Sequence, residues 1–157
     1  MEVTDASRTE RPPGLGASTM TEAFQATAQA HPQRVALRTK DDEFSMTWGE
    51  YADKVRSLSA GLAALGLERG EALGIMLTNR PEFHFVDSAA LHLGATPFSV
   101  YNTYTGEQIA YQVNDAGARI VVTEKAFLDR VQAAQGIEHL IVVDAGDLDE
   151  ALTIADV

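Results

Sequence analysis

Apolar side chains recur every three or four positions between Thr47 and Gly66, and this is the clearest periodic pattern in the chain. Its members are Trp48, Tyr51, Ala52, Val55, Leu58, Leu62 and Leu65. Such spacing predicts an amphipathic helix that buries one face. Thr47, with Glu50 three residues later, forms a capping box at its start, and Gly66 suits a left-handed stop after its end.

Alternating strand and helix patterns follow this helix. The predicted strands are residues 71–77, 96–100, 119–123 and 139–143, and the predicted helices between them are residues 79–94, 105–117 and 124–135. We expect Asn79 to cap the first of these helices and Tyr111 to face inward from the second. The third helix is expected to turn Phe127, Leu128 and Val131 inward.

The first 47 residues follow a different pattern. Residues 1–17 combine charge with proline and glycine and lack periodicity, which predicts a disordered leader. A helix capped by Thr19 and ended by His31-Pro32 is expected next. Residues 34–39 and 43–47 alternate as the two arms of a hairpin.

The fold class predicted from these elements is α/β. Strand, helix and strand joined by short connections form βαβ units, which build a mainly parallel sheet with right-handed crossovers. We expect residues 18–157 to form one layered but incomplete α/β domain after the leader. The acidic stretch 145–157 is expected to add one or two helical turns.

Composition narrows the possible partners. The formal net charge of −11 argues against nucleic acid or an anionic membrane surface as the main partner, because both need a basic face. The absence of cysteine excludes disulfides, thiolate catalysis and cysteine-bound zinc. No signal-peptide pattern is present, and no apolar run approaches the ~20 residues of a transmembrane helix. We therefore expect a cytoplasmic protein, with peripheral membrane association as an alternative.

Candidate catalytic and binding residues are few. His84 and His92 lie eight residues apart on one predicted helix, so their rings do not converge on a metal ion. No serine lies in a G-x-S-x-G turn. The strand-to-helix turn at residues 77–81 has no glycine for phosphate binding, and Glu82 already occupies the positive helix end.

The turn at residues 101–106 is roomier and leaves two interpretations open. In the first, its tyrosine and asparagine side chains line a ligand cleft at the carboxyl edge of the sheet. In the second, which is the more common arrangement, it is an asparagine-containing turn with packed tyrosines. Spacing alone therefore assigns no catalytic, cofactor-binding or metal-ligating residue.

Six short strings occur in order along the chain. They are T-W-G-E-Y (47–51), S-A-G-L-A-A-L-G (59–66), M-L-T-N-R-P-E (76–82), L-G-A-T-P-F (93–98), Y-N-T (101–103) and N-D-A-G-A (114–118). Together they resemble the N-terminal portion of the adenylate-forming (AMP-dependent) acyl-CoA synthetases. The tyrosine-x-threonine turn after the Gly-Ala-x-Pro strand is most similar to bacterial long-chain fatty-acid–CoA ligases. The resemblance covers roughly residues 19–145.

The resemblance implies an enzyme that activates a fatty acid with ATP and Mg²⁺ to an acyl-adenylate and then transfers the acyl group to coenzyme A. In the family, the responsible parts are a Ser/Thr/Gly-rich loop ending in Pro-Lys-Gly, a Tyr-Gly-x-Thr-Glu segment and a lysine of a small C-terminal domain. This sequence contains none of them. No catalytic residue carries over, and fatty acid, ATP, Mg²⁺ and coenzyme A are expected only in a complete enzyme.

We therefore expect an N-terminal fragment of a fatty-acid–CoA ligase that is inactive alone and needs the remaining part of the ligase. The alternative is a non-catalytic interaction or dimerisation partner of a full-length ligase. A third hypothesis, an independent flavodoxin-like nucleotide-binding domain, has no phosphate loop to support it. A sheet that is cut early leaves strand edges uncovered, so the isolated chain is expected to be marginally stable or self-associating.

Overall fold

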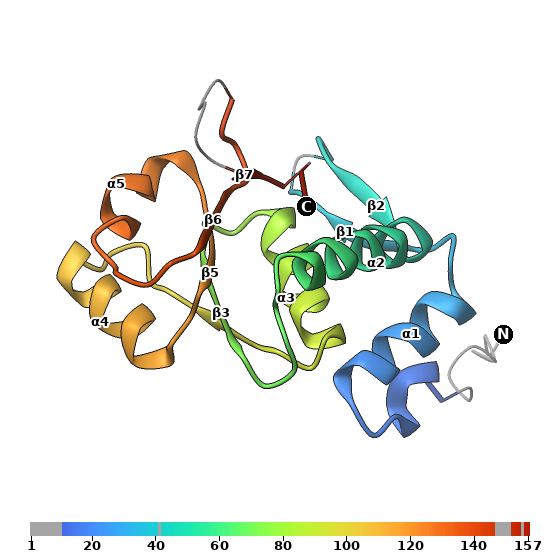
Figure 1. The fold of residues 1–157 in the computed structure, drawn as a ribbon. Helices are drawn as coiled ribbons and strands as arrows, with labels where there is room; N and C mark the ends of the chain where they lie inside the picture. The colour runs from blue at the N-terminus through green and yellow to red at the C-terminus, as the bar shows by residue number, and fades with distance from the viewer. Residues whose placement is uncertain (1–10, 41, 147–151, 155) are drawn as a thin grey trace, which may run out of the picture. The chain divides into compact units, whose positions relative to one another are not determined.

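A computed structural model describes residues 11–40, 42–146, 152–154 and 156–157. The chain divides into two compact units, both drawn in Figure 1. The first unit ends at Ala52 and the second begins at Asp53, so the division falls within helix α2 (Trp48–Ala64). Among the described residues, no helix has both the length and the apolar character that crossing a membrane requires.

The described residues of the first unit form two helical segments and a two-stranded antiparallel sheet. These elements are η2 (Pro13–Gly16), α1 (Met20–Ala30), β1 (Val35–Arg38) and β2 (Ser45–Thr47). The Thr19 side chain caps α1 by accepting a hydrogen bond from the backbone N–H of Glu22, as predicted. Phe24 of α1 packs edge-to-face on Trp48 and Tyr51, with ring centroids 5.6 and 4.9 Å away.

A disordered leader was predicted over residues 1–17, and residues 1–10 of it lie outside the described residues. From Pro13 onward the structure differs from the expected disorder, because η2 forms a turn of 3-10 helix. Gly14 allows this turn to approach α1 closely, since a Cβ at that position would lie 2.9 Å from the carbonyl oxygen of Ala23. This contact packs η2 against α1.

The described residues of the second unit form a five-stranded parallel sheet in the order β4-β3-β5-β6-β7. The strands are β3 (Ala72–Met76), β4 (Thr96–Ser99), β5 (Ile120–Thr123), β6 (His139–Val142) and β7 (Leu152–Thr153). The helices are the rest of α2, α3 (Pro81–His92), α4 (Gly106–Ala116), η3 (Lys125–Phe127) and α5 (Leu128–Val131). Figure 1 shows α4 and α5 on one side of the sheet and α3 on the other. The predicted α/β class is confirmed.

Strand side chains alternate between the two faces of this sheet. On one face, Met76 and Val121 pack with Ile109 and Val113 of α4. The apolar stripe of α2 is also buried, and the Ser59 hydroxyl of α2 donates a hydrogen bond to a carbonyl oxygen of α3, 3.1 Å away. Helices on both faces therefore bury a sheet whose strands are largely apolar.

Two helix predictions are wrong in detail. Arg80, not Asn79, is the N-cap residue of α3, and it makes no side-chain capping bond because a guanidinium has only donors and cannot accept from a helix N–H. Its donors bind the carboxylate of Glu82. Tyr111 does not face inward, since its side chain is 73% exposed. Ile109 lies two residues before Tyr111 on α4 and is buried, and two residues on a helix correspond to opposite faces.

The structure also differs from the last two predicted helical segments, residues 124–135 and 145–157. The helix expected over residues 124–135 shortens to η3 and α5. The Lys125 N–H, at the start of η3, donates to a carboxylate oxygen of Asp144. Val131 is buried there as predicted. Near the end of the chain, the short strand β7 pairs with β6 where helical turns were expected. Residues 147–151 of that stretch lie outside the described residues.

Candidate functional site

Charged side chains meet where strands β3, β5 and β6 end. Glu124 directly follows β5, and Arg80 and Asp144 lie just beyond β3 and β6. Parallel strands end at one edge of a sheet, so these positions come together. Arg80 Nη1 lies 2.9 Å from Glu124 Oε2 and 3.4 Å from Asp144 Oδ2. Arg80 Nε lies 2.9 Å from Glu82 Oε2.

Glu124 is the most buried member of this cluster, with its side chain 8% exposed. The backbone N–H and the hydroxyl of Thr78 donate to its two carboxylate oxygens at 2.8 and 3.2 Å. A buried carboxylate needs such donors, because an unpaired charge away from water is costly. Glu124 thereby ties the connection between β3 and α3 to the end of β5.

The cluster favours the charged forms of Arg80 and Glu82. The hydrogen bond with Glu82 raises the pKa of Arg80, although partial burial opposes this, and Glu124 and Asp144 add to the increase. Partial burial is the largest single influence on Glu82 and by itself would raise its pKa. The hydrogen bonds from Arg80, a backbone hydrogen bond and the charge of Arg80 together outweigh it, so the pKa of Glu82 is lowered. The interaction is therefore an ion-pair network rather than a proton-transfer site.

A nucleotide phosphate does not fit this cluster. Glu82, Glu124 and Asp144 supply three carboxylates against the single guanidinium of Arg80, so the local charge repels an anion. Glu82 also lies in the first turn of α3, where the positive helix end would otherwise attract phosphate. Within the described ranges, no group of three His, Cys, Asp or Glu side chains is placed so that it could hold a metal ion. The arrangement links the ends of three strands.

The turn after β4 is anchored by hydrogen bonds from Arg130 of α5. Arg130 Nη1 donates to the carbonyl oxygens of Asn102 and Tyr104 at 2.7 and 2.9 Å, and the same guanidinium lies 5.0 Å from the ring centroid of Phe127. Tyr101 packs edge-to-face on Tyr104 with ring centroids 5.3 Å apart. These contacts favour the second interpretation of the turn, in which its tyrosines pack. A shallow hollow of about 520 Å³ continues from Tyr104 along the outer face of α4.

The histidines of α3 make separate contacts. His92 Nδ1 lies 2.7 Å from the carbonyl oxygen of Ser88, and the ring of His84 packs on Phe83.

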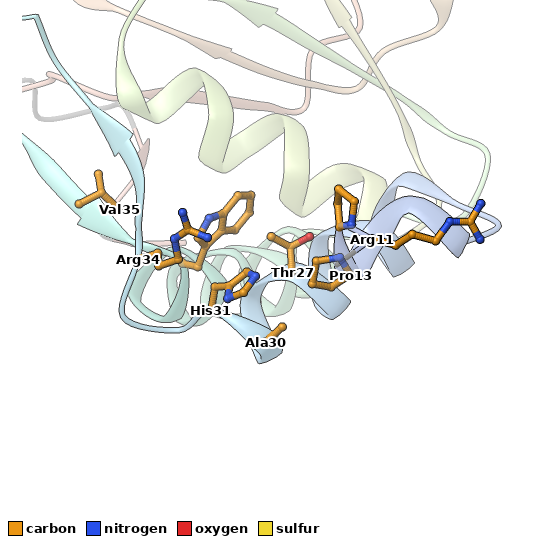
Figure 2. A pocket seen from close by; sticks show the side chains of 9 residues that line it. Arg11, Pro13, Thr27, Ala30, His31, Arg34 and Val35 are labelled. Atoms are coloured by element: carbon orange, nitrogen blue, oxygen red, sulfur yellow. The ribbon is translucent and has the colours of Figure 1, made fainter. Parts of the chain in front are cut away.

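A second concave feature lies in the first unit. It is a pocket of about 670 Å³ between η2, the end of α1, the start of β1 and the start of α2. Figure 2 shows the side chains that line it, among them His31 and Arg34. None of the described residues that line it is acidic.

Sequence reasoning missed both the Arg80 cluster and this pocket. Glu124 and Asp144 could have been noticed, because each is a carboxylate placed at the end of a buried apolar strand. Their meeting with Arg80 depends on β5 lying between β3 and β6, and no local pattern encodes that order. The pocket joins four short segments and has no sequence signature.

The parallel sheet covered by helices on both faces is the fold of the N-terminal lobe in solved structures of adenylate-forming enzymes. The sequence pattern of the family described as AMP-binding enzyme matches residues 24–156. The chain belongs to this family.

Three similar proteins illustrate how much of a family member the chain represents. The uncharacterized protein Rv1549 of Mycobacterium tuberculosis is 47% identical over 142 residues, which are 90% of this chain and 78% of that protein. The 4-coumarate–CoA ligase 1 of Narcissus pseudonarcissus is 33% identical over 100 residues, or 64% of this chain and 18% of the ligase. The solved structure of a long-chain-fatty-acid–CoA ligase from Archaeoglobus fulgidus has a TM-score of 0.74 at 20% identity, covering 87% of this chain and 28% of that one.

Proposed function

We propose that this chain is the N-terminal lobe of a fatty-acid–CoA ligase and that it has no ligase activity by itself. The observation that carries the proposal is a family match over residues 24–156 in a chain that spans 18% of a ligase similar to it. The Arg80 cluster supports the second half of the proposal, because it is an ion-pair network unsuited to phosphate. ATP, Mg²⁺ and coenzyme A would then be bound by the rest of the ligase.

The role proposed for this lobe is to present a rigid sheet edge. Ligands of open α/β sheets bind beyond the carboxyl ends of the strands. In this chain that edge is fixed by the contacts of Glu124 with Arg80 and Thr78, and the neighbouring turn is fixed by Arg130. If the rest of the ligase docks on this edge, it binds a surface that is already ordered. The entropic cost of assembly is then lower.

A fatty acid is proposed as the substrate rather than an aromatic acid. The support is the resemblance of the strings L-G-A-T-P-F and Y-N-T to bacterial fatty-acid–CoA ligases. The similarity to a 4-coumarate–CoA ligase makes an aromatic acid the competing choice. Comparing the activity with palmitate and with 4-coumarate therefore distinguishes a fatty-acid substrate from an aromatic one.

The test is acid-dependent ATP–pyrophosphate exchange with three samples. These are the chain alone, a polypeptide carrying the rest of an AMP-binding ligase, and the two mixed. We expect exchange only in the mixture, and faster exchange with palmitate than with 4-coumarate. Exchange by the chain alone would contradict the proposal, and faster exchange with 4-coumarate would contradict the substrate assignment.

A non-catalytic partner of a full-length ligase is the second candidate. It is favoured by one comparison: the chain covers 78% of the M. tuberculosis relative but 18% of the Narcissus ligase, so the similar proteins include one much shorter than the ligases. This candidate predicts that the chain binds an intact ligase and changes its turnover, with no complementation of a truncated one. A cytoplasmic location, with peripheral membrane association as the alternative, is proposed for either role.

A further inference from the structure

The pocket of the first unit has walls that are fixed by backbone hydrogen bonds. The N–H of His31 donates to the carbonyl oxygen of Thr27 at 3.0 Å, and the N–H of Arg34 donates to the backbone carbonyl oxygen of His31 at 3.0 Å. The N–H of Trp48 then donates to the carbonyl oxygen of Arg34 at 2.9 Å. These bonds connect the end of α1 to the starts of β1 and α2, and they fix the backbone on that side of the pocket.

The polar side of the pocket is basic in a chain whose net charge is −11. In Figure 2, His31 and Arg34 lie on one side, Pro13 lies across from them, and the Arg11 guanidinium extends away from the other labelled side chains. Among the described residues, no carboxylate forms an ion pair with Arg34, whereas Arg38 at the end of β1 is paired with Asp42 at 3.2 Å. Arg34 therefore presents at this site a guanidinium that has no ion-pair partner among the described residues.

The rest of the lining is apolar. It comprises Pro12, Pro13, Ala30, Val35 and the indole ring of Trp48. The volume of about 670 Å³ lies within the range typical of small-molecule sites, which combine apolar walls with a few polar groups. A bare inorganic anion would leave these apolar walls in contact with water.

We propose that this pocket binds an organic oxyanion with an apolar body, namely a carboxylate or a phosphate monoester. The guanidinium of Arg34 pairs with two oxygens of the anion, the ring of His31 supplies a further hydrogen bond, and the apolar body lies against Pro13, Ala30 and Trp48. The site lies entirely in the first unit and is separate from the Arg80 cluster. It stands independently of the proposed ligase role.

The test uses the fluorescence of Trp48, because this is the sole tryptophan of the chain. The full chain is titrated with decanoate, decyl phosphate, decanol and inorganic phosphate, each below the concentration at which micelles form. We expect a saturable change in emission with decanoate, with decyl phosphate or with both, and affinities for decanol and inorganic phosphate that are at least about tenfold weaker. The response to the two charged probes identifies which acid the site prefers.

Matched variants separate charge from shape. Arg34→Gln should weaken binding about tenfold, whereas Arg38→Gln removes the same charge outside the pocket and should change the affinity less than about twofold. Ala30→Phe fills the pocket and should abolish binding, whereas Gln29→Phe adds the same ring outside the lining and should not. Far-ultraviolet circular dichroism of each variant checks that it is folded.

Three results would overturn the proposal. One is equal affinity for decanol and decanoate, which would make the pocket merely apolar. Another is an equal loss of affinity in Arg34→Gln and Arg38→Gln, which would reduce the effect to overall charge. The third is the absence of any saturable change with either charged probe.

Discussion

The guanidinium of Arg80 lies 2.9 Å from the buried carboxylate of Glu124, and this pair joins the start of α3 to the end of β5. The two residues are 44 positions apart in sequence. They meet because β5 pairs directly with β3, so that their ends share one edge of the sheet. The pair is therefore a long-range contact that depends on the strand order.

Removing the guanidinium should destabilise the second unit. In Arg80→Gln, the carboxylate of Glu124 keeps only the donors of Thr78. Loss of one partner of a buried pair costs 3–5 kcal/mol, and since a quarter of Arg80 is exposed we expect a loss of about 2–3 kcal/mol in the free energy of unfolding. Urea unfolding of the variant and of the native chain at pH 7 measures this loss.

The control for this variant is Arg56→Gln. Arg56 pairs with Asp53 on the outside of α2, where both side chains are more than 70% exposed. Such a pair contributes little, so the change should stay below about 0.5 kcal/mol. Equal effects of the two variants would show that the Arg80–Glu124 pair has no special structural role.

Asp87 on α3 should make stability depend on pH. Its pKa is raised above the ordinary 3.8, mainly because burial disfavours the charge, although the charge of His84 opposes this. A carboxyl group with a raised folded pKa binds its proton more tightly when folded, so it costs stability at pH 7 and this cost disappears as the pH falls through the raised pKa towards 3.8.

The variant Asp87→Asn therefore should be more stable than the native chain at pH 7. Because the group is only half buried, we expect a gain of at most about 0.5 kcal/mol after solvent screening is taken into account. The gain should vanish at about pH 3, where the native carboxyl is protonated in both states. Urea unfolding at the two pH values tests this, with the exposed Glu68→Gln as control. A gain that persists at the lower pH would exclude a charge effect.

Gly61 on α2 provides a test of how the end of the chain packs. A Cβ at this position would overlap the carbonyl group of Val157. Alanine usually stabilises a helix by about 1 kcal/mol relative to glycine, so a neutral or destabilising Gly61→Ala would reveal the clash. We expect this variant to be no more stable than the native chain and to lose hydrogen-exchange protection in β7. In a chain shortened to end at Gly146, the same substitution should stabilise.

The edge strand β4 should cause self-association of the isolated chain. It ends the strand order, so its outer edge has no strand partner among the described residues. Free strand edges pair with one another, and a lysine at the edge discourages such pairing. We expect light scattering after size exclusion to show species larger than the monomer, and fewer of them in Ser99→Lys. A single monomeric peak with two-state unfolding for the native chain would contradict this expectation.

Elements with strong local signals could be predicted from the sequence. The start of α2 follows the capping box, since Thr47 and Glu50 hydrogen-bond reciprocally in the structure. The same holds for α4, where Thr105 and Gln108 form a capping box and Gly117 adopts a left-handed conformation at the end. In these segments the periodicity, the cap and the stop agree, and tertiary contacts do not override them.

Elements that depend on distant residues could not be predicted. The bond between the Lys125 N–H and Asp144 at the start of η3 joins residues that are 19 positions apart. The strand β7 exists because the edge of β6 is available to it. The Arg80 cluster and the pocket at Arg34 likewise arise from segments that meet only after folding. Local propensity carries no information about such contacts.

The central claim is that this chain supplies a lobe of a ligase and that the chemistry lies in the remainder. The most direct measurement is palmitate-dependent ATP–pyrophosphate exchange. The polypeptide carrying the rest of the ligase (the remainder) is held at a fixed concentration, and increasing amounts of this chain are added to it. We predict no exchange at zero addition and a rise that saturates at one chain per remainder. Exchange by the chain without the remainder, or none at any ratio, would contradict the claim.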